Sequence, residues 1–244
     1  MASTEIRKRL YERYVSTHAG DGIRLTSASV RSRFRAFANY YGDFLPADKD
    51  ASILDIGCGH GAFLCFHRER GYHNAAGVDI SPEQVAIARR IGLQDVECID
   101  AFQALSVRPG TVAMVSALDF LEHLEKEEAM RALDAIHCAL APGGTVLIHT
   151  VNAESPFFGN VRYGDLTHES AFTHESLKQI LSATCFDDIR IRPAGPIVHG
   201  ILSLMRAVIW RASENLFRLA AAAETGELRD HIFTRNLIAA ARRA

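Results

Sequence analysis

Three glycines at alternate positions mark the segment of this sequence that is best suited to hold a ligand. They lie in Leu54-Asp55-Ile56-Gly57-Cys58-Gly59-His60-Gly61, between an apolar run and a stretch with helical periodicity. Glycine lets the backbone turn sharply and approach a ligand that a Cβ atom would keep away. A purely structural strand-to-helix turn would use the same residues, so this motif alone leaves both interpretations open.

Two carboxylates follow the glycine turn, each at the end of an apolar run. Asp79 ends Gly77-Val78-Asp79, and Asp100 ends Cys98-Ile99-Asp100. A carboxylate beside such a turn can accept hydrogen bonds from both hydroxyls of a ribose, and open α/β sheets bind ligands at the carboxyl ends of their strands. Either aspartate taken singly could be a helix cap, but together with the glycine turn they favour a binding pocket.

The order of these motifs resembles the class I S-adenosylmethionine-dependent methyltransferases. The resemblance continues through Asp119-Phe120-Leu121-Glu122-His123-Leu124 and Leu140-Ala141-Pro142-Gly143-Gly144, and it covers about residues 50–150. It implies S-adenosylmethionine as the cofactor and S-adenosylhomocysteine as the product. The cofactor-binding residues that it implies are Asp55, Gly57, Cys58, Gly59, Gly61, Asp79, Ile80, Asp100, Ala101 and Leu118.

In this resemblance each part of the cofactor has its own residues. The Gly57–Gly61 turn approaches the amino-acid part, Asp79 holds the ribose, and Asp100 with the backbone of Ala101 binds the adenine amino group. Leu118 and Asp119 border the methionine moiety. The Rossmann dehydrogenases are the nearest rival, but they use G-x-G-x-x-G, whereas this chain has G-x-G-x-G.

A later segment, Tyr163-Gly164-Asp165-Leu166-Thr167-His168-Glu169, gathers polar groups without an apolar period, which predicts a loop over the pocket. A hydroxyl acceptor must lose its proton during methyl transfer, and His168 is the preferred general base. Asp165 is its preferred orienting partner or a substrate contact. His123 is the other candidate base. Two alternatives stay open: the loop residues could only cap the next helix, and His123 could only pack.

Regions outside the core resemble methyltransferases encoded with bacterial surface-polysaccharide pathways. The similar segments are Tyr11–His18, Tyr163–His168 with Phe172-Thr173, and Phe233–Leu237. They imply O-methylation of a saccharide or a saccharide-linked small molecule. A quinone-pathway small-molecule O-methyltransferase and a non-catalytic cofactor-binding scaffold remain the alternatives.

The elements that must position these residues alternate between apolar runs and helical patterns, which predicts a parallel sheet with helices on both faces. The helix after Ser81 is marked by Pro82 at its first position and Gln84 as capping-box partner. The expected strands are Ser52–Ile56, Ala75–Asp79, Val96–Ile99, Thr111–Ser116 and Thr145–Thr150, and the expected helices are Ala62–Arg70, Pro82–Ile91 and Lys126–Leu140.

The flanking segments complete a single domain over residues 1–244. Residues 1–45 are expected to form a helical lid or packing layer, with two helices separated by a loop at Gly20-Asp21-Gly22. The part 151–244 holds the substrate loop, a helix from Thr173 to about Thr184, strands Phe186–Arg192 and His231–Ala240, and an inserted helix Ile197–Glu224. The predicted fold is a Rossmann-like, doubly wound, seven-stranded α/β sheet, mostly parallel with its last strand antiparallel.

Composition limits the partners. The 27 Lys and Arg against 29 Asp and Glu disfavour a nucleic-acid substrate, which needs clustered cations. The 11 histidines and 5 cysteines show no metal-ligand spacing or C-x-x-C pair, so we expect no metal and reduced thiols. No signal-peptide core follows Met1, and arginines interrupt the apolar stretch 197–223, so we expect a cytoplasmic protein without a membrane span. A homodimer through the inserted helix is left open.

Overall fold

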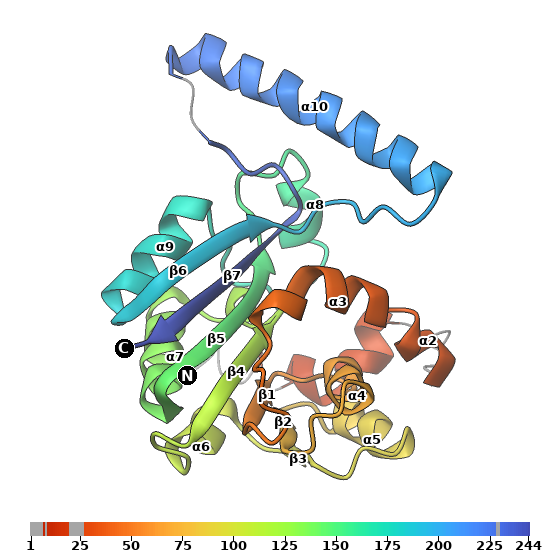
Figure 1. The fold of residues 1–244 in the computed structure, drawn as a ribbon, viewed down its shortest axis with the longest axis vertical. Helices are drawn as coiled ribbons and strands as arrows, with labels where there is room; N and C mark the ends of the chain where they lie inside the picture. The colour runs from red at the N-terminus through yellow and green to blue at the C-terminus, as the bar shows by residue number, and fades with distance from the viewer. Residues whose placement is uncertain (1–6, 8, 20–26, 228–229) are drawn as a thin grey trace.

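The computed structural model describes residues 7, 9–19, 27–227 and 230–244, and a seven-stranded sheet forms their centre (Figure 1). The strand order is β3-β2-β1-β4-β5-β7-β6; β7 runs antiparallel to both its neighbours, and the pairs from β3 to β5 are parallel. This confirms the predicted sheet. The strands are β1 (Ile53–Ile56), β2 (Ala75–Asp79), β3 (Val96–Cys98), β4 (Val112–Leu118), β5 (Leu140–Val151), β6 (Phe186–Pro193) and β7 (Asn236–Arg243).

Helices cover both faces of the sheet, as the alternation of strands and helices predicts. One face packs against α3, α4 and α5, and the other packs against α6, α7 and α9. The helices are α2 (Ser27–Arg31), α3 (Phe34–Tyr41), α4 (Ala62–Glu69), α5 (Pro82–Arg90), α6 (Ala101–Ser106), α7 (Lys126–Ala139), α8 (Phe158–Arg162), α9 (His174–Ala183) and α10 (Ile201–Thr225), with short turns η1 (Val15–Ala19), η2 (Gly42–Phe44) and η3 (Leu121–His123).

Successive residues of one strand serve opposite layers of the core, because side chains alternate along a β-strand. Ile53 packs on the α3, α4 and α5 side, whereas Leu54 packs on the α6, α7 and α9 side. Leu147 and Ile148 of β5 divide in the same way. β1 and the second half of β5, residues 146–151, are therefore buried on both faces, which explains why both stretches are mostly apolar in the sequence.

Several boundaries differ from the prediction. β5 begins at Leu140 instead of Thr145, because Leu140 already pairs with Val112 before a register shift. β7 begins at Asn236 instead of His231, since the side chain of Asn152 binds the carbonyls of Ile232 and Thr234 and holds that segment as a loop. The sequence did not predict α6 or α8.

Two further expectations concern the flanking segments. The long inserted helix is confirmed as α10, which begins at Ile201 after the extended Gly200. The expected loop at Gly20-Asp21-Gly22 lies outside the described residues. Among the helices that the structure describes, none has both the length and the hydropathy needed to cross a membrane.

Candidate active site

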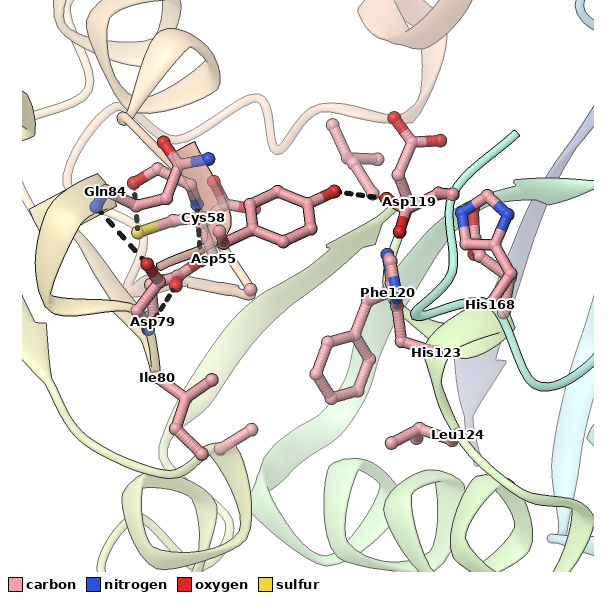
Figure 2. A pocket seen from close by; sticks show the side chains of 18 of the residues that line it. Asp55, Cys58, Asp79, Ile80, Gln84, Asp119, Phe120, His123, Leu124 and His168 are labelled. Atoms are coloured by element: carbon pink, nitrogen blue, oxygen red, sulfur yellow. Dashed lines mark hydrogen bonds between the residues drawn. The ribbon is translucent and has the colours of Figure 1, made fainter. Parts of the chain in front are cut away.

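A cavity of about 750 Å³ opens where β1, β2 and β4 end (Figure 2). We name its two sides by their residues: the glycine side has the Gly57–Gly61 turn and Asp79, and the histidine side has His123, Asp165 and His168. Apart from Gly61, all the predicted site residues line it, namely Asp55, Gly57, Cys58, Gly59, Asp79, Ile80, Asp100, Ala101, Leu118, His123, Asp165 and His168.

The glycine turn needs its glycines for two reasons. Gly57, Gly59 and Gly61 have φ values of 63°, 55° and 78°, in the left-handed region that residues with a Cβ atom rarely adopt. In addition, a Cβ on Gly61 would lie 2.1 Å from Leu93 Cδ1, inside the core below the turn. Gly61 therefore serves packing under the cavity, while Gly57 and Gly59 keep the backbone open to it.

Asp79 is held in place by the backbone around it. Its Oδ2 accepts a hydrogen bond from the Gly59 N–H and its Oδ1 accepts one from the Ser81 N–H, both at 2.8 Å. Burial raises the pKa of this carboxyl, and the two N–H donors oppose that shift. Each oxygen retains acceptor capacity, because a carboxylate offers about four lone-pair sites in all.

Asp55 lies deeper than Asp79, at the floor of the cavity. It is 2% exposed, and its Oδ1 accepts a 2.5 Å hydrogen bond from the Ser116 hydroxyl. Burial raises its pKa to about 7, although Ser116 acts in the opposite direction. Asp55 thus ties β1 to β4 below the turn.

Asp100 caps a helix, which was one of the two roles expected from the sequence, and it also lines the cavity. Its Oδ1 accepts from the backbone N–H groups of Phe102 and Gln103 at 2.9 and 3.3 Å, which caps α6. Ile80, half exposed at 50%, supplies an apolar surface on the same side. A flat aromatic ring could therefore lie against Ile80 and direct a polar edge to Asp100.

Asp119 and Glu122 lie between the glycine side and the histidine side, and the sequence did not predict the residues that they contact. Asp119 has a positive φ of 52°, and its Oδ1 lies 2.6 Å from Nδ1 of His149. Desolvation favours the neutral form of Asp119, but His149 outweighs it, so the pKa of Asp119 is lowered and that of His149 is raised. Glu122 is buried against the Thr150 hydroxyl, and burial together with Asp119 raises its pKa to about 8.

The histidine side contains a chain of hydrogen bonds from a carboxylate to a ring. Asp165 Oδ1 accepts from the Thr167 hydroxyl at 2.6 Å, so the oxygen of that hydroxyl is free to accept from His123 Nδ1 at 2.9 Å. This favours the tautomer that has its proton on Nδ1, in which Nε2 keeps its lone pair. Burial, and then the neighbouring His168, lower the pKa of His123 to about 4.

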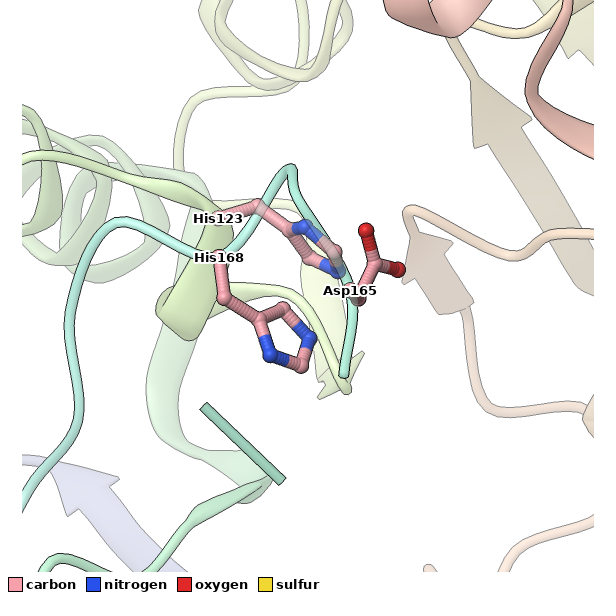
Figure 3. Close-up of side chains that lie close together, drawn as sticks. All are labelled: His123, Asp165 and His168. Atoms are coloured by element: carbon pink, nitrogen blue, oxygen red, sulfur yellow. The ribbon is translucent and has the colours of Figure 1, made fainter. Parts of the chain in front are cut away.

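His168 is oriented differently. Its Nδ1 lies 3.0 Å from the carbonyl oxygen of Val161, which can only accept, so the Nδ1 proton is fixed there and Nε2 keeps its lone pair. The rings of His123 and His168 lie 4.8 Å apart in an edge-to-face arrangement (Figure 3). The structure thus brings His123, Asp165 and His168 together. The sequence predicted Asp165 as the orienting partner of His168, but in the structure Asp165 is connected through Thr167 to His123.

The N-terminal segment covers the histidine side. The Tyr14 hydroxyl donates to Asp165 Oδ2 at 2.5 Å, and Tyr11 and Arg7 also line the cavity. Burial, together with the hydrogen bond to Asp165, raises the pKa of Tyr14. The segment is fixed further by two backbone N–H groups, those of Val15 and Ser16, which donate to Glu83 at 2.7 and 3.1 Å.

His123, Asp165 and His168 are also the residues, in the part of the chain described, that could hold a metal ion. One ligand atom from each lies within 4.8 Å of the others. Both carboxylate oxygens of Asp165 already accept hydrogen bonds, from Tyr14 and Thr167. The absence of a metal therefore stays a prediction.

Comparison with known proteins identifies a protein family that the chain matches. A family model described as a methyltransferase domain matches residues 29–190. Norajmaline N-methyltransferase of Rauvolfia serpentina is 32% identical over 135 residues, which are 52% of this chain and 44% of that protein. The chain thus spans less than half the length of this curated relative.

Solved structures share the fold at low identity. A SAM-dependent methyltransferase from Archaeoglobus fulgidus superposes with a TM-score of 0.64 at 22% identity, covering 94% of this chain and 97% of that one. The phosphoethanolamine N-methyltransferase 2 of Haemonchus contortus, solved with phosphomonomethylethanolamine and S-adenosylhomocysteine, gives 0.61 at 19%, covering 96% and 60%. At these identities the likeness concerns the fold.

Proposed function

Because the chain belongs to the methyltransferase domain family, whose model matches residues 29–190, we propose that it transfers a methyl group from S-adenosylmethionine to a hydroxyl group of a saccharide or saccharide-linked acceptor. One observation carries this proposal. A single cavity joins a glycine turn and a fixed carboxylate, Asp79, to two histidines whose Nδ1 protons are both engaged and whose Nε2 atoms keep lone pairs.

The glycine side fits the cofactor. The carboxylate of Asp79 can accept the two ribose hydroxyls while Gly59 and Ser81 hold it, and Ile80 can cover one face of the adenine. The Gly57–Gly61 turn leaves room for the amino-acid part beside Leu118. When bound, S-adenosylmethionine supplies an activated methyl group and leaves as S-adenosylhomocysteine.

On the histidine side we assign the base to His168. Nε2 of His168 would accept the proton of the acceptor hydroxyl, and the Val161 carbonyl would stabilise the Nδ1–H of the resulting imidazolium. Burial lowers the pKa of His123 to about 4, which makes this ring a poor proton acceptor, and we assign it to positioning through Thr167 and Asp165.

The saccharide class is supported by the polar character of the acceptor region and by the resemblance of the loop and tail segments. Asn160, Arg235 and Asn236 line the same cavity, and groups of this kind form hydrogen bonds with sugar hydroxyls. A second candidate is N-methylation of an amine, because the curated relative named above, norajmaline N-methyltransferase, is an N-methyltransferase and the carboxylate of Asp119 lines the cavity.

The test is a transfer assay with methyl-deuterated S-adenosylmethionine and mass spectrometry. The acceptor panel contains free sugars, nucleotide sugars, a catechol of the quinone-precursor type and a primary amine. We expect a labelled sugar methyl ether. Label only on the amine or only on the catechol would replace the saccharide assignment, and calorimetric binding of S-adenosylhomocysteine without transfer to any acceptor would favour the scaffold.

A further inference from the structure

The long helix α10 exposes its apolar side chains and buries polar ones. Ile201, Leu202 and Ile209 are 80%, 79% and 64% exposed, whereas Ser203 and Glu214 are buried. A surface helix of a water-soluble domain normally has the opposite arrangement. We call the exposed set the apolar face of α10: Ile201, Leu202, Leu204, Met205, Val208, Ile209, Leu216 and Leu219.

This face is continuous along the helix and has a basic border. At 100° per residue its members share one side of a helix about 37 Å long. Arg206 lies at one edge and Arg211 at the other, and both are exposed. α10 has two acidic residues: Glu214, which is buried and receives a 3.5 Å contact from Arg211, and Glu224, which is exposed at the C-terminal end of the helix.

The charges bordering the apolar face of α10 distinguish between two binding partners, a second copy of the chain and a lipid bilayer. In a pair of α10 helices from two copies of the chain, Arg206 and Arg211 would meet a border whose exposed carboxylate, that of Glu224, lies at the C-terminal end of the helix, away from both arginines. An anionic bilayer instead offers an acyl layer for the apolar face and phosphate oxygens for the arginines at its edges. The observations therefore favour a lipid surface over a second copy.

The inner side of α10 connects this face to the cavity. Trp210 packs on Phe157 with ring centroids 6.3 Å apart, and Arg235, which lines the cavity, lies over the same Phe157 ring. Phe157 directly precedes α8, and Figure 1 shows α10 passing beyond α8 at the end of the sheet where β7 begins. The neighbouring loop exposes Tyr163 at 76% and Leu166 at 81%.

We propose that α10 docks on the surface of an anionic lipid bilayer, with its apolar face in the acyl boundary and Arg206 and Arg211 at the lipid phosphates. The histidine side of the cavity would then open close to the bilayer, where a lipid-attached acceptor is presented. The docking goes beyond the proposed function and does not depend on it, so its test measures binding and not methyl transfer.

The test uses the full chain with vesicles of phosphatidylcholine and phosphatidylglycerol, and with pure phosphatidylcholine as the neutral comparison. Sedimentation measures binding, and energy transfer from Trp210, the one tryptophan of the chain, to a dansyl lipid places α10 at the membrane. We expect binding to the anionic vesicles that weakens as salt is added. Binding should fall at least tenfold in L202E/I209E and roughly fivefold per arginine in R206A/R211A.

A matched control is V107E, because Val107 is 70% exposed at the end of α6, far from α10 in Figure 1. It should bind as the unchanged protein does. Circular dichroism checks that each variant is folded. The proposal is overturned if the unchanged chain does not bind anionic vesicles or if L202E/I209E binds equally well. A dimer in analytical ultracentrifugation that L202E/I209E dissociates, without vesicle binding, would assign the face to a second copy.

Discussion

The two sides of the cavity are built in different ways. On the glycine side, Asp79 is held by backbone N–H groups 2 and 20 residues away, at the ends of neighbouring strands. On the histidine side, Asp165 is held by Tyr14 from 151 residues away, and His123 reaches Thr167 across 44 residues. The glycine side depends on strand geometry alone, whereas the histidine side requires three separate segments to assemble.

This difference has a functional meaning. A side made by strand ends is rigid and suits a ligand common to a whole family, while a side made by loops can change its acceptor by changing the loops. Substitution of Asp79 on the glycine side and of His168 on the histidine side should therefore affect different steps: cofactor affinity for Asp79, and the rate of the chemical step for His168.

The largest effect is expected on the histidine side. His168→Ala should lower kcat by about 10²–10⁴-fold, because a general base contributes that much to a proton-coupled step. The affinity for S-adenosylhomocysteine, measured by calorimetry, should stay unchanged. His174→Ala is the matched control, since His174 lies at the start of α9 outside the cavity and pairs with Glu175.

The same assays show whether the roles assigned to His123 and His168 must be exchanged. His123→Ala should lose stability or cofactor affinity together with activity, because it removes the ring that Thr167 holds. If His123→Ala lost kcat with cofactor binding intact while His168→Ala kept it, the carboxylate chain through Asp165 would serve the base, and His168 would belong to a substrate-binding loop.

A smaller effect is expected on the glycine side. Asp79→Ala should weaken S-adenosylhomocysteine binding roughly tenfold or more, because hydrogen bonds to a charged group contribute about 1.5–3 kcal/mol. Saturating cofactor should restore most of kcat. Asp95→Ala is the control: this exposed carboxylate pairs with Arg68 away from the cavity. Unchanged affinity in Asp79→Ala would remove Asp79 from the ribose assignment.

The contrast between the sides also explains what the sequence could and could not predict. The glycine side follows from local rules, since glycines with positive φ and strand-end carboxylates recur at fixed spacing, and Asp55, Asp79 and Asp100 all line the cavity as expected. Asp100 nevertheless caps α6, a helix too short for its periodicity to predict.

On the histidine side the residue types were predictable, but their partners were not. His123, Asp165 and His168 do come together, yet no spacing rule indicates that Thr167 would stand between Asp165 and His123. The roles of Tyr14 and His149 were missed for the same reason: each partner is remote in the sequence, and only the folded chain brings the pairs into contact.

A further prediction concerns the boundary between the sides, where Glu122 is buried. Its pKa is raised from the ordinary 4.5 to about 8, so the folded state binds this proton more tightly than the unfolded state does. Its contribution to stability is therefore complete below pH 4.5 and is lost as the pH rises through about 8. Glu122→Gln should therefore make the fall in Tm between pH 4.5 and about 8 less steep, and each kcal/mol of stability corresponds to roughly 2–4 °C in Tm.

Asp55 must be considered in the same measurement, since its pKa is also raised, to about 7, and it remains in the variant. The Tm of Glu122→Gln should thus still fall with pH, because Asp55 and His149 both have raised pKa values and remain in the variant, but the fall should be less steep than in the unchanged protein. Glu127→Gln, at an exposed position in the first turn of α7, is the control and should follow the unchanged protein. Parallel Tm curves for all three proteins would show that Glu122 does not titrate in the folded state.

The smallest expected effect is that of metal removal, and it tests the histidine side as a whole. His123, Asp165 and His168 place one ligand atom each within 4.8 Å, a group that a divalent cation could draw together. The hydrogen bonds argue for proton transfer instead, because both oxygens of Asp165 already accept from Tyr14 and Thr167, and a cation would have to compete with them. Dialysis against a chelator should therefore leave kcat unchanged within error. If kcat instead falls tenfold or more and zinc or manganese restores it, His123 and His168 are metal ligands. The lower rate of His168→Ala would then result from loss of the metal.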